Sequence, residues 1–463
     1  MNYELARYGD AIDELNHADA IYAKLPGSDA NRAAVYHNLG LVFQSQGDYV
    51  KALEFHNKAL AIREKVLGEE HTSTATSYND IATVYRAQGD YAKALEFHNK
   101  ALAIFEKVLG TEHPDTAMTY NSIALVYDTQ GDYAKALEFY NKALAIREQT
   151  LGKEHPDTAV TYNNIATVYR AQCDYGKALE FYNKALAIRE KVLGKEHPST
   201  AVTYSNIALL YNAQGDYAKA LEFHNKALAI REKVLGKEHP STATTYNNIG
   251  RVYCALGDYG KALEFHEEAL AICQKVLGQE HRDTATSYNN IGEVYRAQGD
   301  YAKALEFYGK ALAIEEKVLG TEHPDTAMTY NSIALVYDTQ GDYGKALEFY
   351  NKALAIYEKV LGKEHPSTAM SYNNIAHVYQ AQGDYGKALE FLNKALAIHE
   401  KVLGKEHPDT ATTYNNIAAF YGGQGGYGKA LAFYDKALAV REKVLGKEHP
   451  DTATTYNNIA SVY

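Results

Sequence analysis

Residues 201–242 read AVTYSNIALLYNAQGDYAKALEFHNKALAIREKVLGKEHPST, and this stretch decides the fold. The same 42-residue unit recurs ten times without a gap, from Ala33 to Thr452. A corner glycine marks its register at Gly47, Gly89, Gly131, Gly215, Gly257, Gly299, Gly341, Gly383 and Gly425, with Cys173 in the remaining position. A constant period of a few tens of residues is the signature of a solenoid built from stacked units.

The first half of the unit has the spacing of an amphipathic helix. Its apolar residues follow each other at intervals of three, one and three, at Tyr204, Ile207, Ala208 and Tyr211. Gly215 can take the left-handed backbone conformation that ends a helix. Asp216 can then cap the start of the next helix.

The second half of the unit predicts another helix, which ends at Gly236. Arg231 and Lys233 lie near its C-terminus, where positive charge suits the helix dipole. The loop 237–242 restarts the cycle, with Pro240 as the helix breaker and Ser241 or Thr242 as the candidate N-cap. Alternation typical of β-strands is absent from the sequence, so the unit is predicted to be a helical hairpin.

The order of these residues resembles the tetratricopeptide repeat. An aromatic residue, Ile-Ala, Tyr, Gly-Asp-Tyr and two Ala-Leu pairs follow one another in each unit. The stretches ALAIREKVLGKEHP and YNNIA are similar to the longer repeats of kinesin light chains. Over residues 33–452 this resemblance implies an all-α, right-handed superhelical solenoid. It also implies a scaffold that binds a protein or peptide in a concave groove and is not an enzyme.

Composition narrows the classes of partner. The 463-residue chain carries a net charge of −11, whereas nucleic-acid binding needs a basic surface. Cys173, Cys254 and Cys273 have no metal-binding or disulfide spacing and fit a reducing compartment. The sequence shows neither a signal pattern nor an apolar run long enough for a membrane span. We therefore expect a cytoplasmic protein with no cofactor, no metal, no nucleic acid and no membrane partner.

The two ends differ from the array. Residues 1–32 are predicted to be an N-terminal capping helix and loop, because Glu14 and Asp19 replace the Phe and Leu of all ten units. One apolar stripe is expected on this helix, at Leu5, Tyr8, Ala11, Ile12, Leu15, Ala18, Ile21 and Leu25. Residues 453–463 are predicted to be the first helix of an incomplete eleventh unit.

The unpaired C-terminal helix leaves two other functions open. The chain could be the sensor or regulatory array of a longer signalling protein truncated at its C-terminus. It could also be a structural spacer that self-associates, with weak head-to-tail contacts between its open ends.

Most residues that could bind a metal, stack on a ligand or react are expected to have structural roles instead. One histidine recurs in each loop between units, at His71, His113, His155, His197, His239, His281, His323, His365, His407 and His449. Because each loop supplies a single histidine, we expect solvated loop residues and no metal array. The tyrosines Tyr162, Tyr169, Tyr175 and Tyr182 are expected in the core. Cys173 should occupy a left-handed backbone position.

An asparagine pair in the first helix is the best candidate for a binding site. Asparagine is unfavourable inside a helix, yet its amide offers the donor and acceptor that an extended peptide backbone requires. By resemblance to kinesin light chains, the second member of the pair would hold peptide, at Asn164, Asn206, Asn248, Asn290, Asn374 and Asn416. Nearby Arg170, Arg251 and Arg296 would contribute charge. The alternative is an asparagine ladder that bonds adjacent first helices.

Side pockets next to this row would set specificity. The positions that vary most between units there are Thr167, Leu209, Arg251, Glu293, Leu335 and His377.

Overall fold

The computed structural model describes residues 8–463, and these form twenty-two α-helices. The predicted all-α solenoid of helical hairpins is confirmed, and no strand occurs in the described range. In chain order the helices are α1 (Tyr8–Tyr22), α2 (Asp29–Ser45), α3 (Tyr49–Leu67), α4 (Thr72–Ala87), α5 (Tyr91–Leu109), α6 (Pro114–Thr129), α7 (Tyr133–Thr150), α8 (Pro156–Ala171), α9 (Tyr175–Val192), α10 (Pro198–Ala213), α11 (Tyr217–Val234), α12 (Pro240–Ala255), α13 (Tyr259–Val276), α14 (Arg282–Ala297), α15 (Tyr301–Val318), α16 (Pro324–Thr339), α17 (Tyr343–Val360), α18 (Pro366–Ala381), α19 (Tyr385–Val402), α20 (Pro408–Gly423), α21 (Tyr427–Val444) and α22 (Pro450–Ala460). From α2 onward, even-numbered helices are the first helices of the units and odd-numbered ones are the second helices. None of the described helices combines the length and hydrophobicity needed to cross a bilayer.

The corner inside the hairpins forms as expected, except in the tenth unit, where Gly426 replaces the aspartate and α21 has no side-chain cap among the described residues. Gly215 has a φ of +74°, and Asp216 accepts a hydrogen bond from the backbone N–H of Lys219 at 3.1 Å. Cys173 has a φ of 57° and is the one non-glycine residue with positive φ in the described chain. The prediction that this cysteine occupies a left-handed position is confirmed.

The cap of the first helix is a correction to the sequence analysis. The N-cap is the loop histidine, not Ser241 or Thr242, because the helix begins at the proline that follows it. Nδ1 of His239 accepts a hydrogen bond from the backbone N–H of Ser241 at 3.1 Å. Thr242 instead donates its hydroxyl to the carbonyl of Gly236 at 2.9 Å and closes the loop.

The core lies between the two helices of a unit and the first helix of the next. Ala208, Ala220 and Ile207 are fully buried, and small alanines let the helices approach closely. Phe223 packs between Tyr204 and Tyr211, with ring centroids 6.0 and 5.6 Å away. The four tyrosines of residues 162–182 are buried or half-buried against this core, as expected.

Helix α1 covers the apolar surface of α2. Ile12, Leu15 and Ala18 contact the first core cluster, while Glu14 is exposed. Asp19 forms an ion pair with Arg32, in which Oδ1 of Asp19 lies 2.9 Å from Nε of Arg32. The predicted stripe is wrong at its end, because Ile21 and Leu25 are exposed. Its first member, Leu5, lies outside the described residues.

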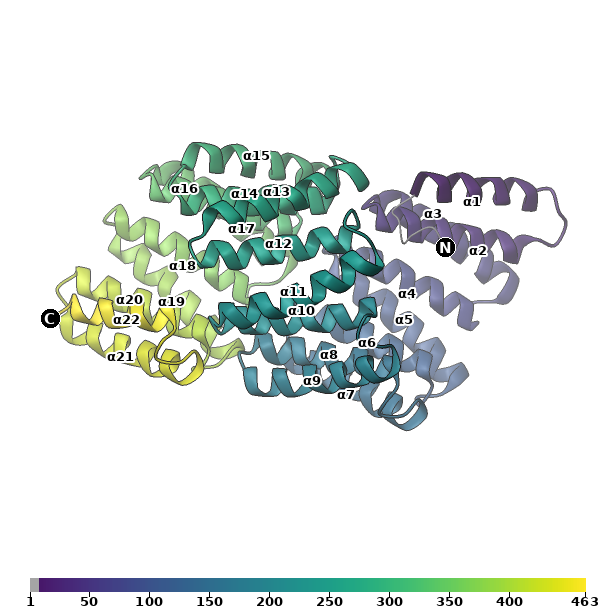
Figure 1. The fold of residues 1–463 in the computed structure, drawn as a ribbon, viewed down its shortest axis with the longest axis horizontal. Coiled ribbons are helices and arrows are strands. Elements are labelled where there is room, and N and C mark those ends of the chain that lie inside the picture. The colour runs from purple at the N-terminus through teal and green to yellow at the C-terminus, as the bar shows by residue number, and fades with distance from the viewer. Residues whose placement is uncertain (1–7) are drawn as a thin grey trace.

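The array coils so tightly that its second turn contacts its first (Figure 1). Cys173 Sγ lies 3.3 Å from Nε2 of His407, a residue 234 positions later, or about 5.6 units. The same spacing brings Gly47 against His281, Gly89 against His323, Gly131 against His365 and Gly215 against His449. We call this line of contacts the turn–turn seam.

Hydrogen bonds cross the seam from the loop histidines. Because Nδ1 accepts the cap hydrogen bond, Nε2 carries the proton and can donate. Nε2 of His323 donates to the carbonyl of Ala87, and Nε2 of His407 to that of Ala171, both at 3.1 Å. The expectation of solvated histidines therefore fits His113 and His155 of the first turn, but is wrong for the buried histidines of the second.

We expect the double variant His323→Ala/His407→Ala to expand the coil, because it removes two of the hydrogen bonds that cross the seam. Small-angle X-ray scattering should show a larger radius of gyration, while circular dichroism should show unchanged helicity. The control His113→Ala/His155→Ala removes the same helix caps without a seam partner and should keep the wild-type radius. Equal radii for both variants would contradict the seam.

Candidate peptide-binding groove

The first helices share one surface, which is hollowed in two places. The C-terminal hollow has a volume of about 640 Å³ and bridges α16, α18 and α20. It adjoins a smaller hollow of about 200 Å³, with which it shares Asn373, Asn374 and Asn416. The central hollow, of about 380 Å³, bridges α10, α12 and α14. We call the surface containing these hollows the first-helix surface.

The first asparagine of the pair is structural in most units, although neither side-chain atom of Asn331 has a hydrogen-bond partner in the described part of the chain. Asn247 is buried, donates Nδ2 to the hydroxyl of Ser287 at 3.0 Å and accepts from Nδ1 of His266 at 2.9 Å. Asn79 makes the same two kinds of bond, to Thr119 and His98. Ser287 and Thr119 belong to the next unit, so this asparagine ties successive first helices together.

The second asparagine divides into two groups. Asn164 and Asn206 donate Nδ2 to Oδ1 of Asn121 and Asn163, the first asparagines of the preceding units, at 3.1 and 3.0 Å. Those acceptors are available because Tyr140 and Tyr182 stand where His98 and His266 stand in their own units. The structural alternative therefore describes part of the row.

The remaining members of the row are half-buried and make no side-chain hydrogen bond to any residue in the range 8–463. They are Asn248, Asn290, Asn374 and Asn416. Asn290 lines the central hollow, and Asn374 and Asn416 line the C-terminal hollow. The structure thus brings free amides and hollows together at three of the six predicted positions.

The three predicted arginines lie in different environments. Arg251 is exposed in the central hollow and has no ion pair among the described residues. Arg296 is held by Glu293, whose Oε2 it contacts through Nε at 2.9 Å, and Tyr308 donates to the same oxygen. Arg170 is half-buried beside Asp128, where burial raises the pKa of that carboxyl to about 6 although Arg170 opposes the shift. Of the three arginines, only Arg251 is therefore both exposed and free of an ion pair with any described residue, so it is the one available to bind a ligand.

Four of the six predicted side-pocket residues line hollows. Arg251 and Glu293 lie in the central hollow, and Leu335 and His377 in the C-terminal one. Nδ1 of His377 lies 2.8 Å from the buried Asp338 carboxylate, which raises the pKa of the histidine. Thr167 is instead 3.1 Å from the Tyr182 hydroxyl, and Leu209 lines neither hollow.

An apolar row that was not predicted from the sequence lies on the same surface. An exposed Met or Val stands four residues before the second asparagine position in five units, at Met118, Val160, Val202, Met328 and Met370. Residues four apart share one helix face, so each side chain lies beside an asparagine or serine. The four-residue spacing between these apolar residues and the asparagine positions could have predicted the row from the sequence. Met370 itself lines the smaller hollow with Asn374.

One first asparagine has an unusual partner. Asn289 donates Nδ2 to Oε1 of Glu315 at 2.9 Å and to Thr329 at 2.7 Å. Five other units place a buried or half-buried arginine at the Glu315 position, at Arg63, Arg147, Arg189, Arg231 and Arg441. Glu315 is only 3% exposed, and burial raises its pKa to about 8.

Comparison with known proteins agrees with this architecture. A family model described as Tetratricopeptide repeat matches segments that together span the chain, at residues 1–65, 31–107, 73–149, 115–191, 157–233, 199–275, 241–317, 283–359, 340–401, 367–434 and 409–463. No curated protein gave a significant match.

Several solved structures resemble the chain. Two crystal structures of a putative kinesin light chain from Podosopora anserina, with nearly identical TPR-like repeats, are 33% identical, with a TM-score of 0.37. They cover 44% of this chain and 97% and 98% of their own. BtubC from P. vanneervenii is 26% identical, covers 51% of this chain and 92% of its own, and has a TM-score of 0.40. A Rap protein complexed with Competence and Sporulation Factor is 15% identical, covers 90% of this chain and 99% of its own, and has a TM-score of 0.52, which shows a shared fold.

Adjacent asparagines should differ in their effect on stability. Asn247→Ala leaves His266 and Ser287 without their buried partner and should lower the free energy of unfolding by about 1–3 kcal/mol. Asn248→Ala removes no hydrogen bond and should change it by less than about 0.5 kcal/mol. Chemical denaturation of both variants checks this, and equal effects would contradict the division of the pair.

Glu315 should make stability fall as pH rises. Its pKa is raised from 4.5 to about 8 in the folded chain, so folding carries no penalty below pH 4.5 and a growing one up to pH 8. At pH 7 the penalty is at most about 3 kcal/mol. We expect Glu315→Gln to raise the melting temperature near pH 7 and to leave it unchanged near pH 4.

Glu306→Gln is the matched control for this measurement. Glu306 lies on the same helix, exposed and paired with Lys310 at 2.7 Å, so its variant should follow the wild-type pH profile. A Glu315→Gln profile parallel to the wild type would show that Glu315 carries no such penalty.

Proposed function

Because the chain belongs to the tetratricopeptide repeat family, we propose that it is a non-enzymatic scaffold that binds an extended peptide or a segment of a partner protein along the first-helix surface. It would act in the cytoplasm, with no nucleic-acid or membrane partner. The observation that carries the proposal is the row of unbonded asparagine amides beside the two hollows.

The amides suit the backbone of an extended peptide. Such a peptide presents N–H and C=O groups along its length, and each asparagine side chain offers both a donor and an acceptor. Asn374 and Asn416 are equivalent positions of successive units and line one hollow, so one bound segment can meet both. Main-chain hydrogen bonds then supply affinity independent of sequence.

The hollows would supply specificity. The C-terminal hollow combines Leu335, Leu392 and Ala419 with the polar pair of His377 and Asp338. This lining favours an apolar anchor side chain with a hydrogen-bonding group at its rim. The central hollow is more polar, since Arg251, Glu293 and Asn290 line it, and it favours a charged or amide side chain.

We expect a peptide-display selection on the wild type to enrich one motif, and Asn374→Ala/Asn416→Ala to lose it. Each lost hydrogen bond to the peptide should weaken binding by about 1 kcal/mol, so the double variant should bind the enriched peptide at least about tenfold more weakly. Fluorescence polarisation with that peptide measures the change.

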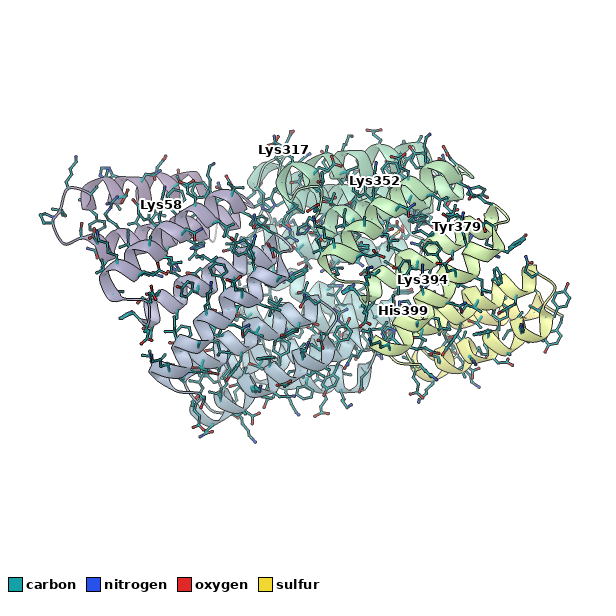
Figure 2. All side chains as sticks on the ribbon, turned by 180° about the vertical axis from the view of Figure 1, so that it is seen from behind. Lys58, Lys317, Lys352, Tyr379, Lys394 and His399 are labelled. Carbon is teal, nitrogen blue, oxygen red and sulfur yellow. The ribbon has the colours of Figure 1, made fainter. Side chains whose placement is uncertain are left out.

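The control variant is Asn351→Ala/Asn393→Ala. These exposed asparagines lie on the second helices α17 and α19, next to Lys352 and Lys394 on the outer surface (Figure 2). The control should bind like the wild type. Equal loss in both variants, or no enrichment by any of the three proteins, would contradict binding on the first-helix surface.

A further inference from the structure

Three side chains with metal-ligating atoms converge near the N-terminal end of the array. His37 lies on α2, His56 on α3 and Asp80 on α4, and one ligand atom of each lies within 4.8 Å of the others. Nδ1 of His37 is 2.8 Å from Oδ2 of Asp80. The ring centroids of His37 and His56 are 5.9 Å apart. We call these three residues the His-His-Asp cluster.

The atoms of the cluster are buried and lack hydrogen-bond partners. His56 is 1% exposed, and neither of its ring nitrogens has a partner within residues 8–463. Nδ1 of His37 and Oδ2 of Asp80 are also buried; they form a 2.8 Å histidine–carboxylate ion pair with each other and have no hydrogen bond to any described residue. Buried polar atoms without a hydrogen bond cost folding free energy, so four such atoms on three facing side chains point to a missing ligand.

Other units show what normally satisfies these positions. In units two and six, His98 and His266 occupy the position of His56 and bond to the first asparagine of the pair. In unit one, His37 replaces that asparagine, and in unit two Asp80 replaces the second asparagine. Two amides have therefore been exchanged for an imidazole and a carboxylate at the one place where a buried histidine faces both.

A second buried histidine provides an internal comparison. His224 occupies the same position in unit five, and its ring nitrogens are likewise unpaired. Ser205 stands where unit one has His37, and Asn248 stands where unit two has Asp80. No histidine, cysteine, aspartate or glutamate occupies either position beside His224, and the His-His-Asp cluster is the single group of three such ligands found between residues 8 and 463.

We propose that His37, His56 and Asp80 bind one divalent transition-metal cation, for which Zn²⁺ is the best-suited ion. Two imidazoles and one carboxylate match the ligand preference of zinc, and water would complete a tetrahedral shell. Ligands of tetrahedral zinc lie about 3.3 Å apart, so binding would need only small shifts: atoms of the cluster up to 4.8 Å apart would move closer, and Nδ1 of His37 and Oδ2 of Asp80, now 2.8 Å apart, would separate slightly. The ion would link α2, α3 and α4 and hence the first two units.

The surroundings favour a neutral imidazole at this place. Because His56 is 1% exposed, burial disfavours its charged form, and the neutral imidazole has one ring nitrogen without a proton that can bind a metal. Gly40 lies directly beneath the ring, since a Cβ there would be 2.5 Å from Cε1 of His56. The expectation of no metal rested on the loop histidines and the cysteines, and neither His37 nor His56 belongs to those sets.

The test uses the full chain, stripped of metal with a chelator and then titrated with ZnCl₂ in competition with a chromophoric indicator. We expect one site per chain in the wild type. His37→Asn, His56→Tyr and Asp80→Asn each install the residue that other units carry and should weaken that site at least about tenfold. Co²⁺ in place of Zn²⁺ should give a visible absorption band that these variants lose.

His98→Tyr is the matched control, because it makes the same exchange one unit later without touching the cluster. It should bind Zn²⁺ like the wild type. Asp80→Asn keeps the shape of the side chain, so circular dichroism on this variant separates loss of a ligand from loss of folding. A wild type that binds no Zn²⁺, or binds no more tightly than the cluster variants, would overturn the proposal.

Discussion

Each unit completes its apolar core only against the first helix of the unit that follows, and the rest of the structure depends on that constraint. The fully buried alanines, such as Ala208 and Ala220, set how closely successive helices approach. Because the units are nearly identical, each one adds nearly the same rotation. That rotation brings the corner of one unit against a loop about 5.6 units later, so the coil acquires contacts that nearest-neighbour packing alone would not produce.

Polar packing inside the coil decides which groups remain free for binding. The side-chain amide of a buried first asparagine needs hydrogen-bond partners, and these partners differ between units. Where a histidine stands on the second helix, as His266 does, it takes the amide oxygen of Asn247. Where a tyrosine replaces it, as Tyr182 does, that oxygen accepts instead from Asn206 of the next unit. The residue on the second helix therefore affects whether the neighbouring asparagine is occupied, but it does not decide this alone, because Tyr350 stands at the same position and Oδ1 of Asn331 still has no partner among the described residues.

Much of the fold could be predicted from local patterns. The period, the two helices of each unit, the Asp caps and the left-handed conformation of Cys173 all depend on residues within a few positions of each other. The histidine caps were missed because Pro240 already fits the first helical turn, which moves the cap to His239, two residues earlier than Ser241. The seam could not be predicted, because it depends on a small rotation summed over several units.

The site was predictable only in outline. The spacing of Asn374 and Asn416 placed them on one surface, but their lack of partners depends on contacts between units. The same holds for His37, His56 and Asp80, which lie on three helices and 19 to 43 positions apart in the chain. Each looks like a single exchange in its own unit, and the cluster appears only when the hairpins are stacked.

The seam also bears on how the length of such a chain can change. A coil of near-identical units has approximate screw symmetry, so every unit presents the same corner on one side and the same histidine loop on the other. If a whole unit is inserted or deleted, each corner pairs with the histidine loop of a neighbouring unit instead of its original one. The corner and loop surfaces still match, because all units are nearly alike. Repeat number can therefore vary during evolution without loss of the contacts between turns, whereas an insertion of a fraction of a unit would break them.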